Sequence, residues 1–567
     1  MADRTPPDVT RFGGPADGPL DRRTYDLARL ESEPWDVAIV GGGIVGAGAL
    51  LDAASRGMRA VLVEQSDIAA GTSSRSSRLI HGGLRYLEQF RLPLVREALA
   101  ERRRLLRNAP HLVTLEPLLF PIYGTPFLTK AFYDAGLTLY DLLGARHDGG
   151  WHRRLDVRQT LAIAPRLRTA GLRGGLLFHD GMEDDARFTL AVVRTALASP
   201  AAPMALTRAR ATGIRTDPRS GLVRGLVVQD LISGTTLEIA ARSVVDATGV
   251  WAAEPGHPFA SPTMRILPSR GAHLIVPRER IPASAGLTIR VPGKIIFFVP
   301  WPDHWLIGTT DAPYEGNADH PTAAAWEVDQ LIDTVNETFD VGLTRDDVVG
   351  TYAGLRPLIA PSSGSTVKAS REHRVTAEDS GIVRIGGGKY TTYRVMARDV
   401  IDAVVHGMGA VDRPSAPSAT ADLALVGAAP RTELMRLTTA LAADPELTAV
   451  HPEAAARLVA RFGTEAPAVI ALGRELDLVC PLIAGRPFLE AEVAWAARHE
   501  LALSLDDVLT RRLRVSMEMR DRGAAIAPRV AAILGAELGW DVERQARECA
   551  IYLEGAIREF SVAPPAS

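Results

Sequence analysis

The chain has 567 residues, 46% of them hydrophobic and 23% charged, and its 64 Lys and Arg residues nearly balance 67 Asp and Glu residues for a formal net charge of −3. This composition is typical of a globular protein with two or three domains, and it provides no global field that would attract nucleic acid. The two cysteines, Cys480 and Cys549, are far apart, which argues against a disulfide framework or a thiol redox motif and fits a reducing cytoplasm.

Residues 1–33 are rich in Pro, Gly and Asp, and we expect them to form a flexible N-terminal tail. They contain no apolar core of the kind that a signal peptide needs. Further along the chain, no uninterrupted apolar run reaches the roughly 18 residues that cross a bilayer. Any contact with a membrane is therefore expected to be peripheral.

The stretch WDVAIVGGGIVGAGALLDAASRGMRAVLVEQSD at 35–67 predicts a strand, a glycine-rich turn, a helix and a second strand. Gly41, Gly43 and Gly46 have the spacing of a dinucleotide-binding turn, where glycines permit the tight turn, the approach of a pyrophosphate and close helix–strand packing. The helix N-terminus would offer its N–H groups to the phosphates. The second strand ends at Glu64, which is placed to accept hydrogen bonds from a ribose diol.

The segment GTSSRSSRLIHGGLRYLE at 71–88 gathers hydroxyl groups, arginines and glycines. Clusters of Gly and Ser usually mark exposed loops. The alternative is that these donors surround a ligand with several negative charges, and the segment alone leaves both interpretations open.

Two apolar segments follow. Residues 91–107 have the pattern of a basic amphipathic helix, which either packs its apolar stripe on the core or rests on an anionic bilayer, and we favour the core. Residues 117–146 are apolar and aromatic. They are expected either to cover the substrate domain or to provide a membrane-facing surface with access to a quinone.

Two further strands run into glycine turns, SVVDATGVWA at 243–252 and GIVRIGGGKYTTYRVMARDVIDAVV at 381–405. A site assembled from three distant segments suits a long, extended FAD better than a nicotinamide cofactor held by one compact domain. Residues 411–430 have the Pro, Ala and Ser content of a linker, and helical patterns follow it. We see no catalytic constellation beyond that linker.

The motifs GGGIVGAG, GTSSRSSRLIHGGLRYLE, DDARF, ATGVWA, IGTTD, AGLRPL and GGGKYTTYR occur in this order. In this respect the chain resembles the FAD-dependent glycerol-3-phosphate dehydrogenases of the aerobic, quinone-linked type, from about residue 35 to the C-terminus. The resemblance is strongest in the first third and in 350–395, and it is looser in the last 150 residues.

The resemblance implies an α/β fold (α+β as a whole). A Rossmann-type FAD-binding domain of the glutathione-reductase/D-amino-acid-oxidase type would be joined to an antiparallel-sheet substrate domain and a C-terminal helical cap domain. The FAD-binding domain would comprise 34–95, 180–265 and 350–410. The substrate-binding domain would comprise 96–179 and 266–349, and the cap domain would comprise 431–567 after the 411–430 linker.

The resemblance implies FAD as the cofactor. The residues expected to bind it are Gly41, Gly43, Ile44, Val45, Gly46, Glu64, Gln65, Thr72, Ser73, Ser74, Ser77, Leu79, His81, Gly82, Gly83, Ala247, Thr248, Gly249, Trp251, Arg356, Gly388, Lys389, Tyr390, Thr391 and Thr392. The helix opening at Thr391 and Thr392 would aim N–H groups at the charge that develops on the reduced flavin near N1 and the C2 carbonyl, with Lys389 beside it.

The substrate implied is glycerol 3-phosphate, whose C2 hydroxyl is oxidised to the ketone of dihydroxyacetone phosphate. A planar guanidinium matches phosphate oxygens bidentately. The expected substrate-binding residues are Arg85, Tyr86, Arg356, Arg371 and Lys389, and Arg356 is also counted as catalytic.

His273 and His81 are the candidate bases for the hydroxyl proton, because an imidazole that titrates near pH 6.5 suits proton abstraction. An arginine-assisted or water-mediated route stays open. The histidines and cysteines show no metal-binding pattern.

The implied electron acceptor is ubiquinone or menaquinone. The implied location is therefore cytoplasmic, peripheral on the cytoplasmic face of the membrane, and a homodimer is compatible with the resemblance. Three alternatives stay open: a glycerophosphate oxidase that uses O₂, an amine- or hydroxy-acid-oxidising flavoenzyme of the same fold, and a non-catalytic protein with a structural FAD. The sequence does not decide whether FAD is held covalently.

Overall fold

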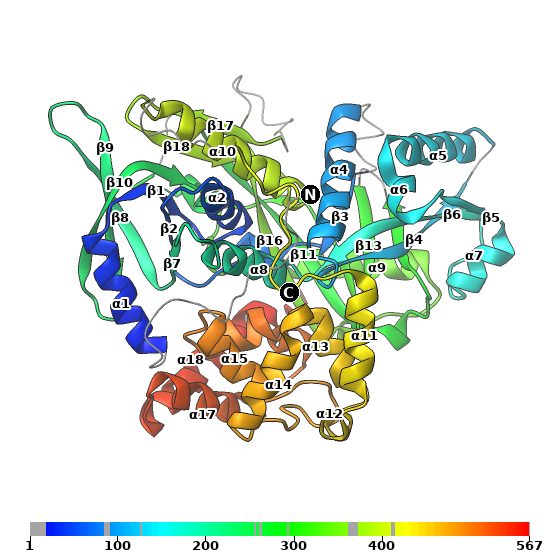
Figure 1. Ribbon diagram of the computed structural model, residues 1–567. Coiled ribbons are helices and arrows are strands. Elements are labelled where there is room, and N and C mark those ends of the chain that lie inside the picture. Colours follow the sequence, from blue (N-terminus) through cyan, green and yellow to red (C-terminus); the bar gives the residue numbers. More distant parts are fainter. Residues whose placement is uncertain are drawn as a thin grey trace.

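The computed structural model describes residues 19–83, 91–124, 127–254, 257–259, 264–291, 294–360, 372–409, 414 and 416–565. Three parts are visible in Figure 1: two sheets side by side with their helices, and a helical part below them. Together they confirm the predicted class, an α/β cofactor-binding fold joined to an antiparallel sheet and a C-terminal helical domain.

The first sheet is built around parallel strands whose near-continuous Val, Ile, Leu and Ala residues are buried on both faces. These strands are β1 (Trp35–Val40), β2 (Ala60–Val63), β7 (Met204–Leu206), β10 (Thr236–Asp246) and β18 (Ile382–Gly386). Strand β10 lies beside β1 although nearly 200 residues separate them, in register from Trp35 with Ala241 to Val40 with Asp246. The carboxyl ends of β1, β10 and β18 therefore meet at one edge.

The remaining elements of this part extend or cover the sheet. Strand β17 (Arg374–Ala377) pairs antiparallel with β18, and β8 (Ala209–Thr216) and β9 (Val223–Asp230) form an antiparallel extension next to β10. Helices α2 (Ile44–Ser55), α8 (Asp185–Leu197) and α10 (Tyr393–Gly407) bury their apolar residues in a common core with β1 and β2.

The second sheet is antiparallel except for the pairing of β4 with β12. Its strands are β3 (Leu79–Ile80), β4 (Val113–Tyr123), β5 (Arg153–Leu155), β6 (Leu172–Glu183), β11 (Ile266–Pro277), β12 (Gly286–Val291), β13 (Lys294–Trp301), β14 (His304–Gly308), β15 (Ala312–Pro313) and β16 (Gly350–Ile359). Its helical elements are α4 (Leu92–Asn108), α5 (Phe127–Tyr140), η2 (Asp141–Ala145), α6 (Arg146–Gly149), α7 (Val157–Ile163) and α9 (Ala325–Thr338).

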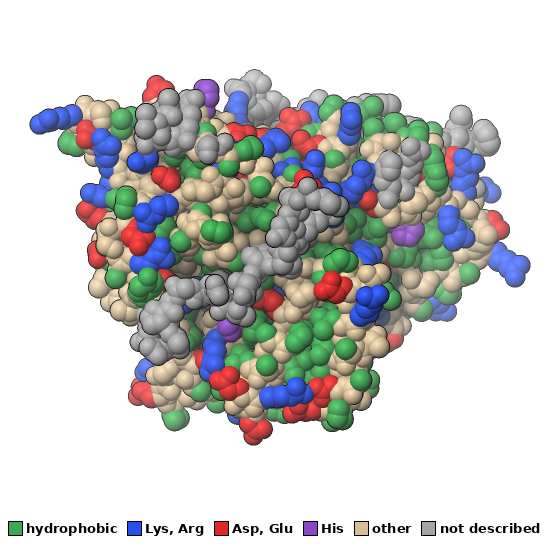
Figure 2. Space-filling model, in the orientation of Figure 1, with side chains coloured by type: hydrophobic (Ala, Val, Ile, Leu, Met, Phe, Trp, Pro, Cys, Tyr) green, Lys and Arg blue, Asp and Glu red, His purple; other side chains and the backbone are tan. Residues whose placement is uncertain are grey.

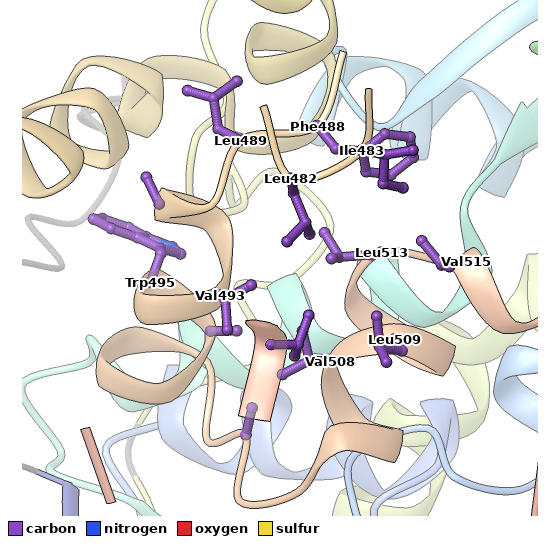
Figure 3. Close-up of a cluster of buried hydrophobic side chains, with 14 of the residues drawn as sticks. Leu482, Ile483, Phe488, Leu489, Val493, Trp495, Val508, Leu509, Leu513 and Val515 are labelled. Carbon is purple, nitrogen blue, oxygen red and sulfur yellow. The ribbon is translucent and has the colours of Figure 1, made fainter. Parts of the chain in front are cut away.

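The C-terminal part is helical. Its elements are α11 (Arg431–Ala442), α12 (Pro445–Val450), α13 (Ala454–Phe462), η7 (Gly463–Glu465), α14 (Ala466–Glu475), α15 (Ala491–His499), η8 (Asp507–Arg512), α16 (Val515–Glu518), α17 (Ala527–Leu538) and α18 (Val542–Phe560). Figure 3 shows part of its core, where Val493, Val508, Leu509 and Leu513 point toward one another. The same buried cluster includes Ile275, Leu306 and Tyr352 of the second sheet, so the C-terminal domain packs its core directly against that sheet.

The expected N-terminal tail is wrong from residue 19 onward. Residues Pro19–Ser32 form helix α1, in which Leu30 is fully buried. Arg23 donates hydrogen bonds to Asp230 Oδ1 (2.5 Å) and to the carbonyl of Thr207. The helix forms because its apolar residues meet the antiparallel extension of the first sheet.

Two expected domain boundaries also differ from the structure. Strand β16, placed with the cofactor domain by sequence, pairs along its whole length with β11 and so belongs to the second sheet. Strand β6 continues to Glu183, past the expected boundary at 180. A boundary drawn from motifs alone therefore cuts through β6 and assigns the whole of β16 to the wrong sheet.

Helix α4 confirms the core-packing interpretation of residues 91–107. Val95 and Leu99 are fully buried among Leu118, Phe120 and other residues of β4 and β6. Figure 2 shows positive and negative side chains interspersed over the visible face, as the near-balanced composition suggests. In the part of the chain that is described, no helix is both long enough and apolar enough to cross a membrane.

Candidate active site

The glycine turn after β1 has the close backbone packing that the sequence suggested. Gly41 has φ +109°, and a Cβ there would lie 2.6 Å from the carbonyl oxygen of Ala247 at the end of β10. A Cβ on Gly46 would lie 1.9 Å from the carbonyl oxygen of Gly41. Gly43 is the N-cap of α2. No side chain other than hydrogen fits at Gly41 or Gly46. Gly43, Ile44 and Val45, at the start of α2, line the space beyond β1.

A cavity of about 640 Å³ opens at this edge of the first sheet and extends to the second sheet. It brings together most of the predicted residues. Those that line it are Gly41, Gly43, Ile44, Val45, Glu64, Gln65, Thr72, Ser73, Ser77, Leu79, His81, Ala247, Thr248, Gly249, Trp251, His273, Arg356, Gly388, Lys389, Tyr390 and Thr391. One continuous space therefore connects the dinucleotide-type turn with Arg356 and both candidate bases.

Several predicted residues are placed elsewhere. Gly46, Ser74, Gly82, Gly83 and Thr392 do not line the cavity. Ser74 turns its hydroxyl back to the carbonyl of Gly71, and the N–H of Gly82 donates to the hydroxyl of Tyr140. Their contribution is to the backbone path that surrounds the cavity. Arg85, Tyr86 and Arg371 lie outside the described residues.

The hydroxyl-rich segment forms the short helix η1 (Thr72–Ser74) beside the turn. Ser73 Oγ accepts a hydrogen bond from the N–H of Ile44 (2.9 Å), and Thr72 Oγ1 donates to the carbonyl of Leu355 in β16 (2.6 Å). The segment thus connects the first turn of α2 to the second sheet. In its described part, 71–83, it is a packed wall of the cavity rather than an exposed loop.

Glu64 lines the cavity beside the glycine turn. Its Oε2 accepts from the N–H of Gly42 and its Oε1 from the N–H of Ser66. Burial raises the pKa of this carboxyl, and the two backbone donors oppose that shift. A ribose diol bound here would donate hydrogen bonds to a carboxylate that these two backbone N–H groups already orient.

The third glycine turn differs in one detail from the expectation. Gly387 and Gly388 have positive φ values of +72° and +86°, and residues Tyr390–Thr392 form the short helix η6 before α10 begins at Tyr393. The hydroxyl of Tyr390 donates to the carbonyl of Asp185, 2.6 Å away. Lys389, which precedes this short helix, lines the cavity.

Arg356 is held on β16 by the loop after β14. Its Nη2 donates to Thr309 Oγ1 (3.0 Å) and to the carbonyl of Thr310 (3.3 Å), and its Nη1 lies 3.5 Å from Asp311 Oδ1. The side chain is 24% exposed. A guanidinium held in this way presents fixed donors to an anion in the cavity.

His273 lies on β11 and is 3% exposed. Its ring stacks on Tyr352 with 4.6 Å between centroids, and Nε2 is 2.8 Å from Ser77 Oγ. Burial lowers the pKa of His273 to about 3, and the charges of Arg356 and Arg78 add to the effect. The expected titration near pH 6.5 is therefore wrong for this residue, because the sequence could not show its burial beside two arginines.

Sequence reasoning missed the cavity residues that come from the C-terminal domain. Asp506, Arg511 and Glu559 line the cavity, as does Arg75, whose guanidinium pairs with Glu559. No local pattern marks these residues, and the partners Arg75 and Glu559 are 484 positions apart. The only sequence feature that pointed toward these contacts was the concentration of arginines in the 71–88 segment, which includes Arg75.

The residues of the cavity fit FAD. Glycines with no room for a Cβ, a helix N-terminus and an oriented carboxylate occur at one end, and both candidate bases lie at the other. No group of three His, Cys, Asp or Glu side chains among the described residues is placed to hold a metal ion. Fold and cavity together define a flavin-dependent oxidoreductase.

Comparisons with known proteins agree. Residues 36–394 match the family of FAD dependent oxidoreductases, and residues 418–545 match the C-terminal domain of alpha-glycerophosphate oxidase. The glycerol-3-phosphate dehydrogenase of Mycobacterium leprae is 41% identical over 94% of this chain and 89% of its own length. Glycerol-3-phosphate dehydrogenase 2 of Mycobacterium tuberculosis strain H37Rv is 40% identical over 94% of this chain and 90% of its own.

Among solved structures, the glycerol-3-phosphate dehydrogenase from Bacillus halodurans, complexed with FAD, superposes with a TM-score of 0.78. It is 27% identical, and the match covers 96% of this chain and 99% of that one. The chain belongs to the glycerol-3-phosphate dehydrogenase family of FAD-dependent oxidoreductases.

Proposed function

We propose that this protein oxidises sn-glycerol 3-phosphate to dihydroxyacetone phosphate with FAD and passes the electrons to a membrane quinone. The observation that carries the proposal is the single cavity that joins the glycine turn of β1 to Arg356 and His273. The relatives are glycerol-3-phosphate dehydrogenases, and they supply the substrate class.

Arg356 binds the phosphate in this proposal. Glycerol 3-phosphate carries nearly two negative charges, and Thr309 and the Thr310 carbonyl already orient the guanidinium. A dianion removed from water needs more than one cation. Arg85 and Arg371, with Tyr86, are proposed to complete the clamp, and Lys389 lines the same cavity.

When bound, FAD accepts the hydride that leaves C2 of the substrate. The hydroxyl proton leaves in the same oxidation, so a carbonyl forms as one C–H and one O–H bond break. His273 and His81 are the proposed acceptors of that proton. His273 is held neutral by its burial and accepts through Nε2, which Ser77 Oγ contacts, whereas His81 lies on the cavity wall near Phe297.

The cofactor is proposed to lie along the predicted residues that line the cavity. The N–H groups of the first turn of α2 would hold the pyrophosphate, and Glu64 would accept from the ribose. The N–H groups that open η6, together with Lys389, stabilise negative charge at the far end of the flavin. These backbone donors are fixed by the fold and need no rearrangement during the reaction.

The electron acceptor, the location and the assembly are also proposals. We propose ubiquinone or menaquinone as acceptor, with the protein peripheral on the cytoplasmic face of the membrane and assembled as a homodimer. Flotation with vesicles of mixed zwitterionic and anionic lipids tests the attachment. A protein that stays wholly in the unbound fraction at low and moderate salt would refute it.

One anaerobic titration tests the oxidation itself. Adding sn-glycerol 3-phosphate to the FAD-loaded protein should bleach the flavin within seconds, whereas sn-glycerol 1-phosphate, glycine and a 2-hydroxy acid should leave it oxidised. Bleaching by glycine or the hydroxy acid instead would assign the site to another substrate class. A flavin that no compound bleaches would make the cofactor purely structural.

A second assay identifies the acceptor. Turnover is measured anaerobically with a short-chain quinone and, separately, in air with peroxide detection. Fast quinone reduction with little peroxide supports the dehydrogenase. Fast, stoichiometric peroxide formation with slow quinone reduction would instead identify an oxidase.

A further inference from the structure

The C-terminal helical domain reaches the cofactor cavity. Glu559 lies one residue before the end of α18 and lines the cavity although it is 7% exposed. Asp506, the N-cap of η8, and Arg511, within η8, line it as well. A domain that begins after the cofactor-binding motifs end therefore supplies part of the cavity wall.

Glu559 acts on the cavity through Arg75. The Arg75 Nε donates to Glu559 Oε1 (2.5 Å), while its Nη1 donates to the carbonyls of Ala70 and Gly71 and to Ser74 Oγ. One buried guanidinium thus ties α18 to the whole turn that precedes and contains η1. That turn carries Ser73, whose hydroxyl accepts from the first turn of α2.

A second contact holds the neighbouring loop. Asp67 is fully buried and follows the Glu64–Ser66 segment of the cavity. Its carboxylate accepts from Arg511 Nε (2.5 Å) and from Arg512 Nη1 and Nη2 (2.7 and 2.9 Å). Both arginines belong to η8, so the C-terminal domain supplies two buried cations for a carboxylate of the cofactor domain.

These two contacts share a consequence. Undocking the C-terminal domain would leave Arg75 and Asp67 without these partners. A buried charge that loses its partner is strongly unfavourable, so the 64–75 loop, which forms one side of the cavity, would be released from its present position. Binding of a ligand that needs this loop in place is then coupled to docking of the domain.

We propose that the C-terminal domain positions the 64–75 loop and thereby sets the affinity for FAD. Glu559 acts on this loop through Arg75. Arg511 and Arg512 act on it through Asp67. They are positioning residues for the cofactor. The inference concerns cofactor binding and does not depend on which alcohol the protein oxidises.

The experiment measures FAD binding to apoprotein prepared from the full chain. Flavin fluorescence quenching gives the Kd for the unchanged protein and for Glu559→Gln, with Glu554→Gln as the matched control, because Glu554 is an exposed carboxylate on the same helix. We expect the Kd to rise at least tenfold in Glu559→Gln and to stay within twofold in the control. A Kd for Glu559→Gln within twofold of the unchanged protein would overturn the proposal.

A double-variant cycle separates positioning from general loss of stability. If Glu559 acts through Arg75, the double variant Arg75→Lys/Glu559→Gln binds FAD no more weakly than the weaker single variant. Independent, multiplying losses would overturn the proposed route. Should Glu559→Gln fail to fold, as judged by circular dichroism, Glu559→Asp takes its place, and it must raise the FAD release rate of the holoenzyme for the proposal to stand.

Discussion

The guanidinium of Arg356 lies directly against the backbone of Gly271. A Cβ at position 271 would be 2.4 Å from Arg356 Nη2 and 2.4 Å from Thr309 Oγ1. Strands β11 and β16 pair here, with Gly271 opposite Gly354. The absence of a side chain at 271 therefore decides where the proposed phosphate-binding group lies.

Replacing Gly271 by Ala should displace Arg356 without removing it. Loss of a charge-assisted hydrogen bond costs about 1.5–3 kcal/mol, so we expect the KM of the FAD-loaded enzyme for glycerol 3-phosphate to rise roughly 10- to 100-fold. Steady-state kinetics and the flavin-to-protein ratio check this.

The control is Gly213→Ala, at a glycine whose Cβ would meet nothing nearer than 3.9 Å. Equal effects of the two substitutions on this KM would contradict the phosphate-binding role given to Arg356.

His273 provides a prediction about pH. Because burial and the two arginines lower its pKa to about 3, the ring should stay neutral between about pH 5 and pH 8. If His273 accepts the substrate proton, His273→Asn should lower kcat/KM by about 100-fold or more. The ratio of unchanged to variant kcat/KM should be constant over that range, since ionisation of the substrate phosphate cancels in the ratio.

Two results would count against a buried, neutral His273 that accepts the substrate proton. A ratio that falls toward acid with a midpoint near pH 6.5 would mean an exposed, ordinary histidine. Full turnover of His273→Asn at every pH would leave His81 as the candidate base.

The sequence predicts those parts of the site that depend on local backbone geometry. Gly41, Gly43 and Gly46 lie within one turn, and their spacing reflects steric contacts that the structure reproduces. Arg75 and Glu559 could not be paired in this way, because their contact depends on how two domains dock. The lowered pKa of His273 has the same origin, since it comes from burial by the fold and from Arg356 and Arg78, neither of which is near His273 in sequence.

Helix α1 shows a second reason why a prediction from sequence can fail. Pro19 at its first position and Leu30 on its buried face are ordinary helix signals, but the Pro, Gly and Asp content of the residues before them outweighed these signals. Stability here comes from docking on the sheet extension and from the Arg23–Asp230 ion pair. Neither the sheet extension nor Asp230 is close to α1 in the sequence, so a local pattern does not indicate these contacts.

A buried histidine outside the cavity should make stability pH-dependent. Burial lowers the pKa of His111 from 6.5 to about 3, with a smaller contribution from Arg187. Below pH 6.5 the unfolded chain binds a proton that the folded state does not, so unfolding becomes easier as pH falls. This one residue contributes a slope of about 1.4 kcal/mol per pH unit at most.

Urea unfolding at several pH values tests this prediction with His111→Gln and, as control, His406→Gln at an exposed position of α10. The slope of unfolding free energy against pH should be shallower in His111→Gln between about pH 6.5 and pH 4 and unchanged in the control. Parallel curves for all three proteins would show that His111 is protonated in the folded state.

The ion pair between Arg102 and Asp180 joins α4 to β6 in the interior. The two side chains are 0% and 4% exposed, with Arg102 Nη1 2.5 Å from Asp180 Oδ1. The hydroxyl of Tyr140 donates to the same carboxylate (2.9 Å) and accepts from the N–H of Gly82 (2.8 Å). This network therefore holds the chain next to His81.

Replacing Asp180 by Asn leaves Arg102 buried with its strongest partner neutralised. We expect the free energy of unfolding to fall by about 3–5 kcal/mol, measured by urea titration. Arg102→Met combined with Asp180→Leu should recover most of this loss, because an apolar pair leaves no buried charge unpaired. Arg103→Ala, which removes a 42% exposed partner of Asp148, should cost less than about 1 kcal/mol. If Asp180→Asn costs no more than Arg103→Ala, the Arg102–Asp180 pair is not what holds α4 to β6.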